Sequence, residues 1–540
     1  MPVPENPHPD TSMWMFWSLI GLFAAFLAFV AFFVYPNQEG LISSTQLQIG
    51  ALKNVSAAYA ETLPIQDVGI NNQGRSMFIA FVMLAHVLFA NLHLGGSWIA
   101  AVSESFHIKT GSHRFDRIAK SLTLFNVILF SFGATFAIAG VLFFIALFPV
   151  FASDWFRVMW WPLLIEAILF AIEIVFLYSY WFTWDKIGRR NHQILGYGYA
   201  ISVFFQTFMI NMVAGGMLTP GVTEISFAGS GLLSIPYADA ISMWFNPTLW
   251  RLQFHRVFAA ISYMGFILAM LAVFHFLDRK GIRDKKYWDW VTSYGITWGL
   301  LGLVIQPVLG MIYMLKIQDA NELAFTYIMH GPRAWEMLLM AGTLSFLFLT
   351  VMLFFLERRE RLFSKLESRN LHTIFKWFFI IGLGCLFVII QPAWLYAPFV
   401  DDPAAWANPL GVMDYKYVAI AGLILIGVVM LTIDALVLSD LKESDWGNLS
   451  KVSRAAAVFA GLLGIFIIEI MGFVRESARS PWTVYNIIPV PPGSVQYPTP
   501  LAILNIFGVW VIISVVVVIV FWLVSKVTAH HPEDAEEIKS

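Results

Sequence analysis

The chain has 540 residues, of which 59% are hydrophobic and 13% are charged, and its formal net charge at pH 7 is −2. Because a soluble domain carries about a quarter of its residues as charged side chains, this composition excludes a soluble enzyme and indicates a polytopic helical membrane protein. The charge balance argues against nucleic acid as a partner. The single cysteine, Cys385, excludes an intrachain disulfide and a c-type haem attachment motif, which needs two cysteines.

Twelve apolar segments are long enough to cross a membrane, which takes roughly 20 residues. The first segment follows a flank without Lys or Arg, and no small-residue cleavage site comes after it, so we expect a retained helix and not a signal peptide. The expected spans are about 14–35, 76–103, 119–150, 159–184, 196–217, 251–277, 290–316, 333–356, 374–397, 415–440, 453–476 and 501–526.

Basic residues are distributed unevenly between the connecting segments, which predicts the orientation in the membrane. Segments rich in Lys and Arg alternate with linkers that are poor in them and rich in Gly, Pro, Asn and aromatic residues. We expect the basic set to be cytoplasmic, with both termini inside, and the aromatic residues of the outer linkers to lie at the membrane interface. The basic segments are 103–117, 184–193, 278–286, 357–365 and the end near Lys526; the outer linkers are 36–75, 218–250, 398–414 and 477–500, with Trp244, Trp250, Trp406, Tyr415 and Trp482.

Two histidines lie in the second expected span. His86 and His93 are seven residues apart and therefore share one face of a helix. A single intramembrane histidine is usually a hydrogen-bonded polar residue of a bundle and less often a metal ligand. We interpret His93 as a hydrogen-bonding residue, with a ligand role as the alternative.

Two glutamates lie in the fourth expected span. Glu166 and Glu173 also share a helix face at a spacing of seven. Two carboxylates on one buried face repel each other unless they share protons or a cation. Such pairs commonly mark proton relays or charge compensation. The alternative is a pair of neutral, hydrogen-bonded glutamic acids.

His255 enters an apolar helix eight residues after Pro247 and is flanked by Arg251 and Arg256. Taken alone, this pattern is typical of an interfacial histidine among interfacial arginines. The alternative is a cofactor ligand whose neighbouring arginines neutralise acidic groups of the cofactor.

Glu469 lies in an apolar run, AAAVFAGLLGIFII, with no basic residue within one helical turn. An ionised carboxylate at such a depth costs several kcal/mol unless it is compensated. Either the carboxyl group is protonated or paired with a neighbouring helix, or it is a ligand to a buried cation such as a haem iron.

These motifs together resemble subunit I of cytochrome bd-type terminal oxidases. Glu469 is followed at offsets of ten, twelve and thirteen by Arg479, Pro481 and Trp482, as at the end of that family's eighth core helix, although Ala478 replaces a family glycine. His-x-Leu-Phe from His86, then Leu-Gly, then Glu104 eighteen residues on, resembles the first core helix. The stretches around Glu166 and Glu173, and around His255, are similar to the third and fifth core helices; the third has glutamates eight apart in the family and seven apart here.

The resemblance implies three haems. His86 would ligate the haem at which oxygen binds, Glu469 a high-spin haem b, and His255 a low-spin haem b. The oxygen-site haem would be haem d or a further haem b. The resemblance also implies propionate contacts from Arg251 and Arg256, proton delivery by Glu166 and Glu173, and catalytic roles for Glu104, Arg479 and Trp482.

The sequence departs from the family in two places. The family's second ligand to the low-spin haem is a Met in an Arg-x-Met motif, but Lys416 and Val418 occupy those positions here. We predict Met337 as the replacement, from a segment that also offers His330, Arg333 and Met340. The family's long loop after the sixth core helix is also missing, because residues 317–332 are too short and the additional spans 333–356 and 374–397 follow.

We therefore expect an all-α polytopic membrane bundle resembling bd oxidase subunit I. The expected function is four-electron reduction of dioxygen to water with cytoplasmic protons, in a bacterial or archaeal cytoplasmic membrane and beside a second subunit resembling subunit II. A bd-like electron-transfer subunit without oxygen reduction, or a haem-free proton or ion transporter using Glu166, Glu173 and Glu469, are the alternatives. The expected regions are 1–75 (extra helix and linker), 76–316 (six-helix core), 317–440 (variable region), 441–526 (last two core helices) and 527–540 (tail).

The electron donor follows from the short loop. In the resembled enzymes the long loop helps build an outer pocket for quinol. Because this chain lacks it, we expect another donor, such as a cytochrome c or an iron–sulfur or haem partner subunit, docking on segments 36–75 and 218–250. A quinol site rebuilt from the extra helices is the alternative.

Overall fold

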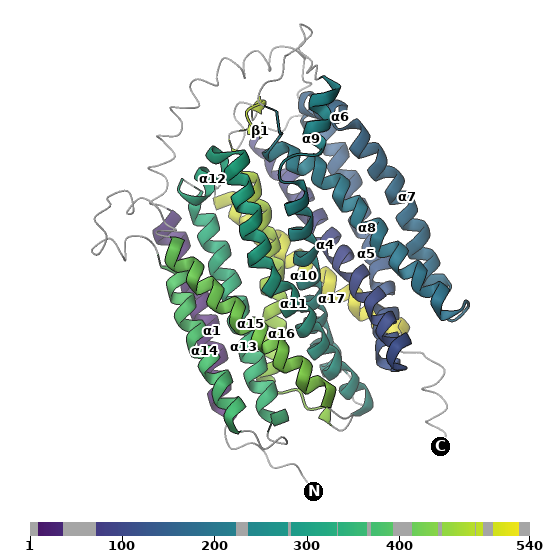
Figure 1. Cartoon of the computed structure of the whole chain (residues 1–540), viewed down its shortest axis with the longest axis vertical. Coiled ribbons are helices and arrows are strands. Elements are labelled where there is room, and N and C mark those ends of the chain that lie inside the picture. The colour runs from purple at the N-terminus through teal and green to yellow at the C-terminus, as the bar shows by residue number, and fades with distance from the viewer. Residues whose placement is uncertain are drawn as a thin grey trace. The chain divides into compact units, whose positions relative to one another are not determined.

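The computed structural model describes residues 9–35, 72–222, 236–278, 282–331, 333–363, 369–391, 413–440, 445–480, 482–489 and 500–528. Large parts of the expected outer linkers, together with Trp406, Pro481 and both chain ends, lie outside the described residues. The described chain is almost entirely helical, with a two-stranded hairpin after the penultimate long helix (Figure 1).

Within the described residues, twelve helices are long and apolar enough to cross a membrane, which confirms the expected number of spans. The physical reason is that a long apolar segment in lipid must satisfy its backbone groups internally, and an α-helix does so within one segment. The expected span 374–397 corresponds to a helix that ends at Ile390. The expected linkers, in contrast, contain short helices that hydropathy alone does not reveal.

The chain divides into two compact units. Unit 1 comprises Met1–Leu41, Ser262–Pro307 and Ile328–Ile470, and unit 2 comprises Ile42–Ile261, Val308–Tyr327 and Met471–Ser540. Four helices contribute residues to both units: α10 (Leu249–Asp278), α11 (Ile282–Ala320), α12 (Glu322–Met329) and α16 (Lys451–Ala478).

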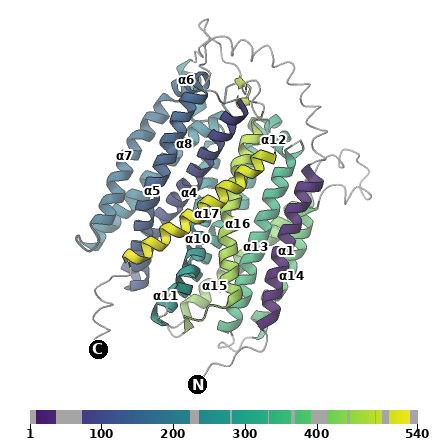
Figure 2. The same cartoon turned by 180° about the vertical axis from the view of Figure 1, so that it is seen from behind.

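Unit 2 is built on two helix pairs, α4 with α5 and α7 with α8, and α4 also packs against α8. The last helix, α17, lies against α4 and α5 (Figure 2). Between α4 and α5 the chain turns at Gly111, whose φ of +71° lies in the left-handed region that glycine adopts without strain. The elements are α4 (Asn72–Thr110), α5 (His113–Leu147), α6 (Pro149–Val158), α7 (Trp160–Phe182), α8 (Arg189–Leu218), α9 (Tyr237–Trp244), α12 (Glu322–Met329, which ends in unit 1), β1 (Trp482–Val484), β2 (Ile488–Pro489) and α17 (Pro500–Thr528).

One end of unit 2 is closed by an apolar cluster from α6, α8, α9 and the hairpin. Trp155 and Met243 are fully buried in this cluster, and Val484 of β1 packs among them. The Trp244 indole donates a hydrogen bond to the Val158 carbonyl oxygen at 2.8 Å, and the Tyr485 amide donates to Met217 at 2.9 Å. The short helices thus cover the ends of the long helices around them.

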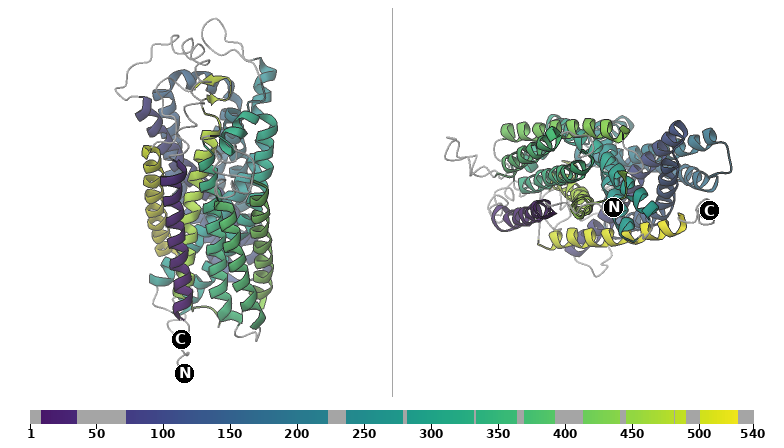
Figure 3. Two further views of the ribbon diagram at one scale, coloured as in Figure 1. Left: turned by 90° about the vertical axis from the view of Figure 1, so that its left-hand side faces the viewer. Right: turned by 90° about the horizontal axis from the view of Figure 1, so that it is seen from below.

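Unit 1 contains the extra helices. Helix α13 packs against α1 and α14, and α14 packs against α15, so these helices run side by side (Figure 3). Aromatic rings fill the contact, with Phe23 of α1 against Phe346 of α13 and Phe459 of α16. The elements are α1 (Pro9–Phe29) continued by the π-helical turn η1 (Val30–Val34), α13 (Ala334–Phe363), α14 (Arg369–Ile390) and α15 (Met413–Asp440).

Candidate functional site

His86 lies on α4 and faces α5. Its Nδ1 atom donates a hydrogen bond to the Gly133 carbonyl oxygen at 3.1 Å. Because a carbonyl oxygen only accepts, this contact places the ring hydrogen on Nδ1 and leaves Nε2 with a free lone pair. A metal-binding imidazole usually donates a hydrogen bond from the ring nitrogen that does not bind the metal, and this hydrogen bond fixes the tautomer. His86 is therefore prepared to act as a ligand through Nε2.

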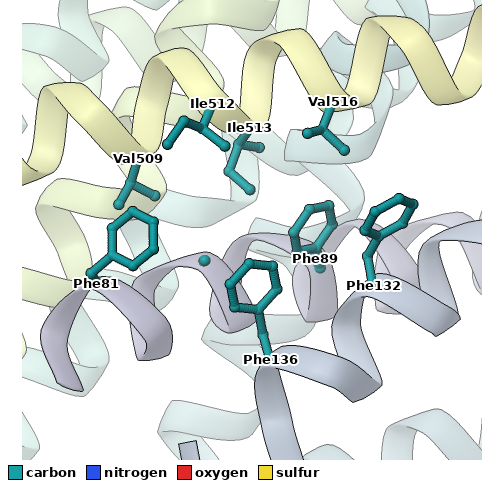
Figure 4. Close-up of a pocket in the computed structure, with 9 residues that line it drawn as sticks. Phe81, Phe89, Phe132, Phe136, Val509, Ile512, Ile513 and Val516 are labelled. Carbon is teal, nitrogen blue, oxygen red and sulfur yellow. The ribbon is translucent and has the colours of Figure 1, made fainter. Parts of the chain in front are cut away.

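An apolar cavity of about 170 Å³ lies between α4, α5 and α17 (Figure 4). Two of its lining residues, Ala85 on α4 and Phe132 on α5, are sequence neighbours of His86 and Gly133. Its apolar lining gives water no hydrogen-bonding partner. The lining residues are Phe81, Ala85, Phe89, Phe132, Phe136, Val509, Ile512, Ile513 and Val516.

His93, two helical turns further along α4, contacts polar groups of two other helices. Its Nε2 atom pairs with Oε1 of Glu173 on α7, and the Tyr199 hydroxyl of α8 lies 2.9 Å from the same nitrogen. Glu173 is 1% exposed, and its Oε2 atom has no hydrogen-bond partner among the described residues. The hydrogen-bonding interpretation of His93 agrees with this geometry. Glu166 lies on the same helix as Glu173 but is only partly buried.

Glu104, at the far end of α4, is enclosed in a second polar cluster. His192 Nδ1 lies 2.6 Å from Glu104 Oε1, and the Tyr180 hydroxyl donates to Oε2 at 2.9 Å. The Nε2 atom of His192 donates to the Tyr180 carbonyl oxygen at 2.8 Å, so every polar atom of the Glu104 carboxylate and the His192 ring has a partner. All three side chains are at most 3% exposed. The cluster joins α4, α7 and α8.

Two ion pairs lie at the same end of unit 2. Arg189 contacts Asp116 at 2.7 Å, and Lys120 contacts Asp185 at 3.3 Å. The Arg189–Asp116 contact joins the two basic segments 103–117 and 184–193, whose location on the cytoplasmic side of the membrane stays a prediction.

His255 lies on α10 within unit 2 and is buried. Its ring stacks on Tyr313 of α11, with ring centroids 5.9 Å apart. Gly310 makes this approach possible, because a β-carbon there would lie 3.3 Å from the His255 Cε1 atom. The imidazole is therefore held against the backbone of α11 by a glycine and an aromatic ring.

The two arginines that flank His255 differ in their surroundings. Arg256 donates to the Asn211 side chain at 2.9 Å, and Asn211 in turn donates to Gln253 at 2.7 Å. Arg251 is exposed and donates to the Pro247 carbonyl oxygen at 3.2 Å. A further cation, Arg475 of α16, donates to the Ala214 carbonyl oxygen at 2.8 Å. Arg256 and Arg475 are thus two partly buried cations of unit 2, and sequence reasoning did not assign Arg475 to the site.

Glu469 lies on α16 within unit 1 and is fully buried. Neither of its carboxylate oxygens has a hydrogen-bond partner among the described residues. The Tyr263 hydroxyl of α10 is likewise buried without a partner in the described chain, and Tyr263 packs against Gly464 one turn before Glu469. Of the buried acids on which sequence reasoning concentrated, Glu469 is the one whose polar atoms are all unsatisfied.

Arg479 and Trp482 lie just beyond α16. Arg479 donates to the Glu476 carboxylate and to the Thr483 carbonyl oxygen. Trp482 begins strand β1, with its ring centroid 6.4 Å from that of Tyr485. Both residues therefore shape the hairpin that follows α16, and their catalytic role stays a prediction.

Met337 and Lys416 belong to unit 1. Met337 is buried on α13, one residue after Glu336, which lies 3.6 Å from Arg333. Lys416 on α15 is only 2% exposed and donates to the Gln391 carbonyl oxygen at 2.7 Å. Because His255 belongs to unit 2, the pairing of Met337 with His255 stays a prediction.

Sequence reasoning missed several polar residues of unit 2. His192 was counted only as part of a basic connecting segment, although it is buried in the first turn of α8. Tyr180, Tyr199 and Asn211 lie in apolar runs where hydropathy gives them no distinction. These residues could have been recognised in the sequence as polar His, Tyr and Asn side chains within or next to the span carrying Glu166 and Glu173 and the span that follows it.

Comparison with known proteins agrees with the resemblance. Residues 75–330 match the family described as cytochrome bd terminal oxidase subunit I. A putative cytochrome bd menaquinol oxidase subunit I of Bacillus subtilis (strain 168) is 26% identical over 258 residues, which are 47% of this chain and 54% of the relative. The cytochrome bd ubiquinol oxidase subunit 1 of the same organism is 24% identical over 212 residues, 38% of this chain and 43% of the relative. The chain thus matches about half the length of these curated relatives.

The solved bd oxidase from Geobacillus thermodenitrificans has a similar fold, with a TM-score of 0.51 and 14% sequence identity, covering 85% of this chain and 98% of that chain. This similarity confirms the predicted bd-like helix bundle. The family match includes the positions of His86, Glu104, Glu173 and His255, and it ends at residue 330. Residues 75–330 of this chain are therefore similar to the cytochrome bd terminal oxidase subunit I family, and the likeness of the remaining residues is one of fold.

Proposed function

We propose that the chain is the haem-bearing subunit of a membrane-bound terminal oxidase, which takes electrons from an outer-side donor and reduces dioxygen to water. The observation that carries the proposal is Glu469. Its buried carboxylate has no hydrogen-bond donor or cation among the described residues, and such a group costs several kcal/mol when it is ionised within a membrane. Binding a metal cation compensates that charge directly.

The residues of the chain fit haem. His86 has an Nε2 lone pair and a fixed tautomer, His255 is held edgewise against Gly310, and Glu469 has two unsatisfied oxygens. We assign these three side chains as haem-iron ligands, and Met337 stays the predicted second ligand of the low-spin haem. The partly buried cations Arg256 and Arg475 suit the negative charge of haem propionates. When bound, haem supplies reversible one-electron transfer and oxygen binding.

Proton delivery is assigned to the acidic side chains of unit 2. Glu104 projects from α4, which also carries His86, and Glu173 and Glu166 project from α7. The end of unit 2 that carries the Arg189–Asp116 and Lys120–Asp185 pairs is assigned to the cytoplasmic side. Protons then enter near Glu104 and move toward His86.

The partners follow from the family. A second membrane subunit and dioxygen are proposed as partners, and haem b and a haem d or further haem b as cofactors. The two relatives named above are a menaquinol and a ubiquinol oxidase subunit. The match to the family ends at residue 330, before the extra helix α13, so we assign a different donor, a cytochrome c-like protein, with quinol as the alternative.

Oxygen consumption by the purified complex tests this function without knowledge of the natural donor. Ascorbate with a small redox mediator is expected to sustain oxygen uptake in the native protein. The His86→Ala variant is expected to lose it. A haem-loaded complex that consumes no oxygen would instead identify an electron-transfer subunit, and a complex without haem would support the transporter.

A further inference from the structure

The contact between His93 and Glu173 has no role in the haem assignments. The His93 ring reaches across from α4 to Glu173 of α7, and the Tyr199 hydroxyl of α8 lies 2.9 Å from Nε2 and 3.2 Å from Nδ1. The Phe130 ring of α5 lies 5.7 Å from the imidazole and places an apolar surface beside it. His93 and Glu173 are 7% and 1% exposed.

The net charge of the His93–Glu173 pair depends on how many protons the two side chains hold. With one shared proton, the pair is either an imidazolium with a carboxylate or a neutral imidazole with a carboxylic acid, and both forms have a net charge of zero. A proton can therefore move between the two side chains without changing the net charge of a buried site, which avoids the cost of an unpaired buried ion. The Oε2 atom of Glu173, which has no partner within the described chain, is open to receive or release the next proton.

The cluster around Glu104 also contains a buried histidine, His192, but its hydrogen bonding differs from that of the His93–Glu173 pair. Both nitrogens of His192 have fixed partners, and both oxygens of Glu104 are also paired. That cluster has no open atom, so it holds α4, α7 and α8 together and needs rearrangement before it can pass a proton. The His93–Glu173 pair has an open oxygen and a hydroxyl within hydrogen-bonding distance of either ring nitrogen.

The position of His93 on α4 also suits a transfer step. It is seven residues from His86 and eleven from Glu104, which corresponds to about 10 Å and about 16 Å along the helix axis. His93 thus lies between the proposed entry at Glu104 and the proposed haem ligand His86.

We propose that His93 is a proton-holding residue that exchanges a proton with Glu173 on the path to the oxygen site, with Tyr199 orienting its ring. In the step, the O–H bond of the Glu173 carboxyl breaks and an N–H bond forms at the imidazole, giving a carboxylate and an imidazolium. Release of that proton toward the haem restores the neutral ring, and a new proton binds Glu173. The inference rests on the proposed oxidase function.

The test compares substitutions around the same ring. His93→Gln keeps a hydrogen-bond donor for Glu173 but cannot take up a proton. Phe130→Leu alters the packing of the imidazole and removes no titratable group. The titratable groups that face the ring are Glu173 of α7 and Tyr199 of α8, with Glu166 further along α7, so Tyr199→Phe is measured as well. For each variant, haem content, oxygen uptake and its pH profile are recorded.

His93→Gln is expected to retain the native haem spectrum, to lower oxygen uptake roughly a hundredfold, near the lower end for positioned proton-transfer groups, and to change the pH profile. Phe130→Leu is expected to keep the native profile. Native turnover and an unchanged pH profile in His93→Gln would overturn the proposal while leaving the oxidase function intact. Equal losses in His93→Gln and Phe130→Leu would also overturn it, because they would show a packing role.

An infrared measurement separates this proposal from the oxidase function. The C=O stretch of a protonated Glu173 is identified by its loss in Glu173→Gln and followed through a pH titration of the purified protein. We expect the titration of that band to shift in His93→Gln, whether or not oxygen is consumed. A titration identical to that of the native protein would contradict the shared proton.

Discussion

Three buried acids of this chain are compensated to different degrees. Glu104 has a donor on each oxygen, Glu173 has partners on one oxygen, and Glu469 has none within the described residues. A structural acid is expected to be fully satisfied, because an unpaired buried group costs about 1–3 kcal/mol or more. The unsatisfied oxygens therefore identify where the chain needs an external group, a mobile proton at Glu173 and a metal cation at Glu469.

The haem-ligand assignments predict selective losses. Glu469→Ala and His86→Ala are each expected to abolish the high-spin haem bands and to spare the low-spin band, because a haem iron that loses its ligand needs another donor. His255→Ala is expected to remove the low-spin band. Reduced-minus-oxidised spectra of the purified variants check this, with the exposed Glu322→Ala of α12 as control. Unchanged high-spin haem in both Glu469→Ala and His86→Ala would reject the assignment.

The Glu104 cluster predicts a stability effect. Tyr180→Phe removes the hydroxyl that donates to Glu104 Oε2 and leaves a buried carboxylate oxygen unpaired. The free energy of unfolding is expected to fall by about 1–3 kcal/mol. Tyr178→Phe, two residues away on the same helix and partly exposed, is the matched control. Thermal unfolding in detergent measures both, and equal melting temperatures for the two variants would contradict the structural role of the cluster.

At the scale of helices, the sequence predicted the spans well, because a long apolar run in lipid has few alternatives to a helix. The short helices α6, α9 and α12 were not predicted, since they are too short to show a hydropathy signal and depend on packing against neighbouring elements. The contacts of the site were also not predictable. Glu104 and His192 are 88 residues apart, and His93 and Glu173 are 80 apart, so their pairing depends on the packing of whole helices.

Helices α10 and α11 approach each other closely in unit 1. A β-carbon at Gly265 would collide with the backbone of Gly299, and the Ser262 hydroxyl donates to the Gly299 carbonyl oxygen at 2.8 Å. The contact therefore requires glycine at position 265, because the backbones of the two helices lie directly against each other.

This contact predicts that Gly265→Ala lowers the free energy of unfolding by about 1–3 kcal/mol, the usual cost of overpacking. Gly384→Ala on α14 is the matched control, because a β-carbon there meets no atom within 4 Å. Thermal unfolding of both variants is the measurement. A Gly265→Ala protein as stable as Gly384→Ala would show that the helices can separate without cost.

For the whole molecule, the family match and the departures from it occupy different parts of the chain. Residues 75–330 carry the match, and the extra helices α13 and α14 lie beyond it, as does α15, the expected seventh core helix. Between α11 and α13 the described residues form the short helix α12, which begins after Asn321, whose side chain accepts from the Ala324 amide at 3.1 Å. We propose that this compact connection takes the place of the long quinol loop that the resemblance implies.

The compact connection predicts the electron donor. Reduced cytochrome c is expected to support faster steady-state oxygen uptake by the purified complex than a short-chain quinol does. The two donors are compared in the same preparation at equal concentrations of reducing equivalents. Fast, inhibitor-sensitive turnover with quinol alone would show that the extra helices rebuild a quinol site.

Haem bound through His86, His255 and Glu469 distinguishes an oxidase subunit from an ion transporter. The reduced-minus-oxidised absorbance spectrum of the purified native protein shows whether haem is present. We expect low-spin haem b bands together with bands of high-spin haem. A purified, folded protein without haem bands would refute haem binding and favour an ion transporter, and low-spin bands alone would refute the oxygen-reducing role.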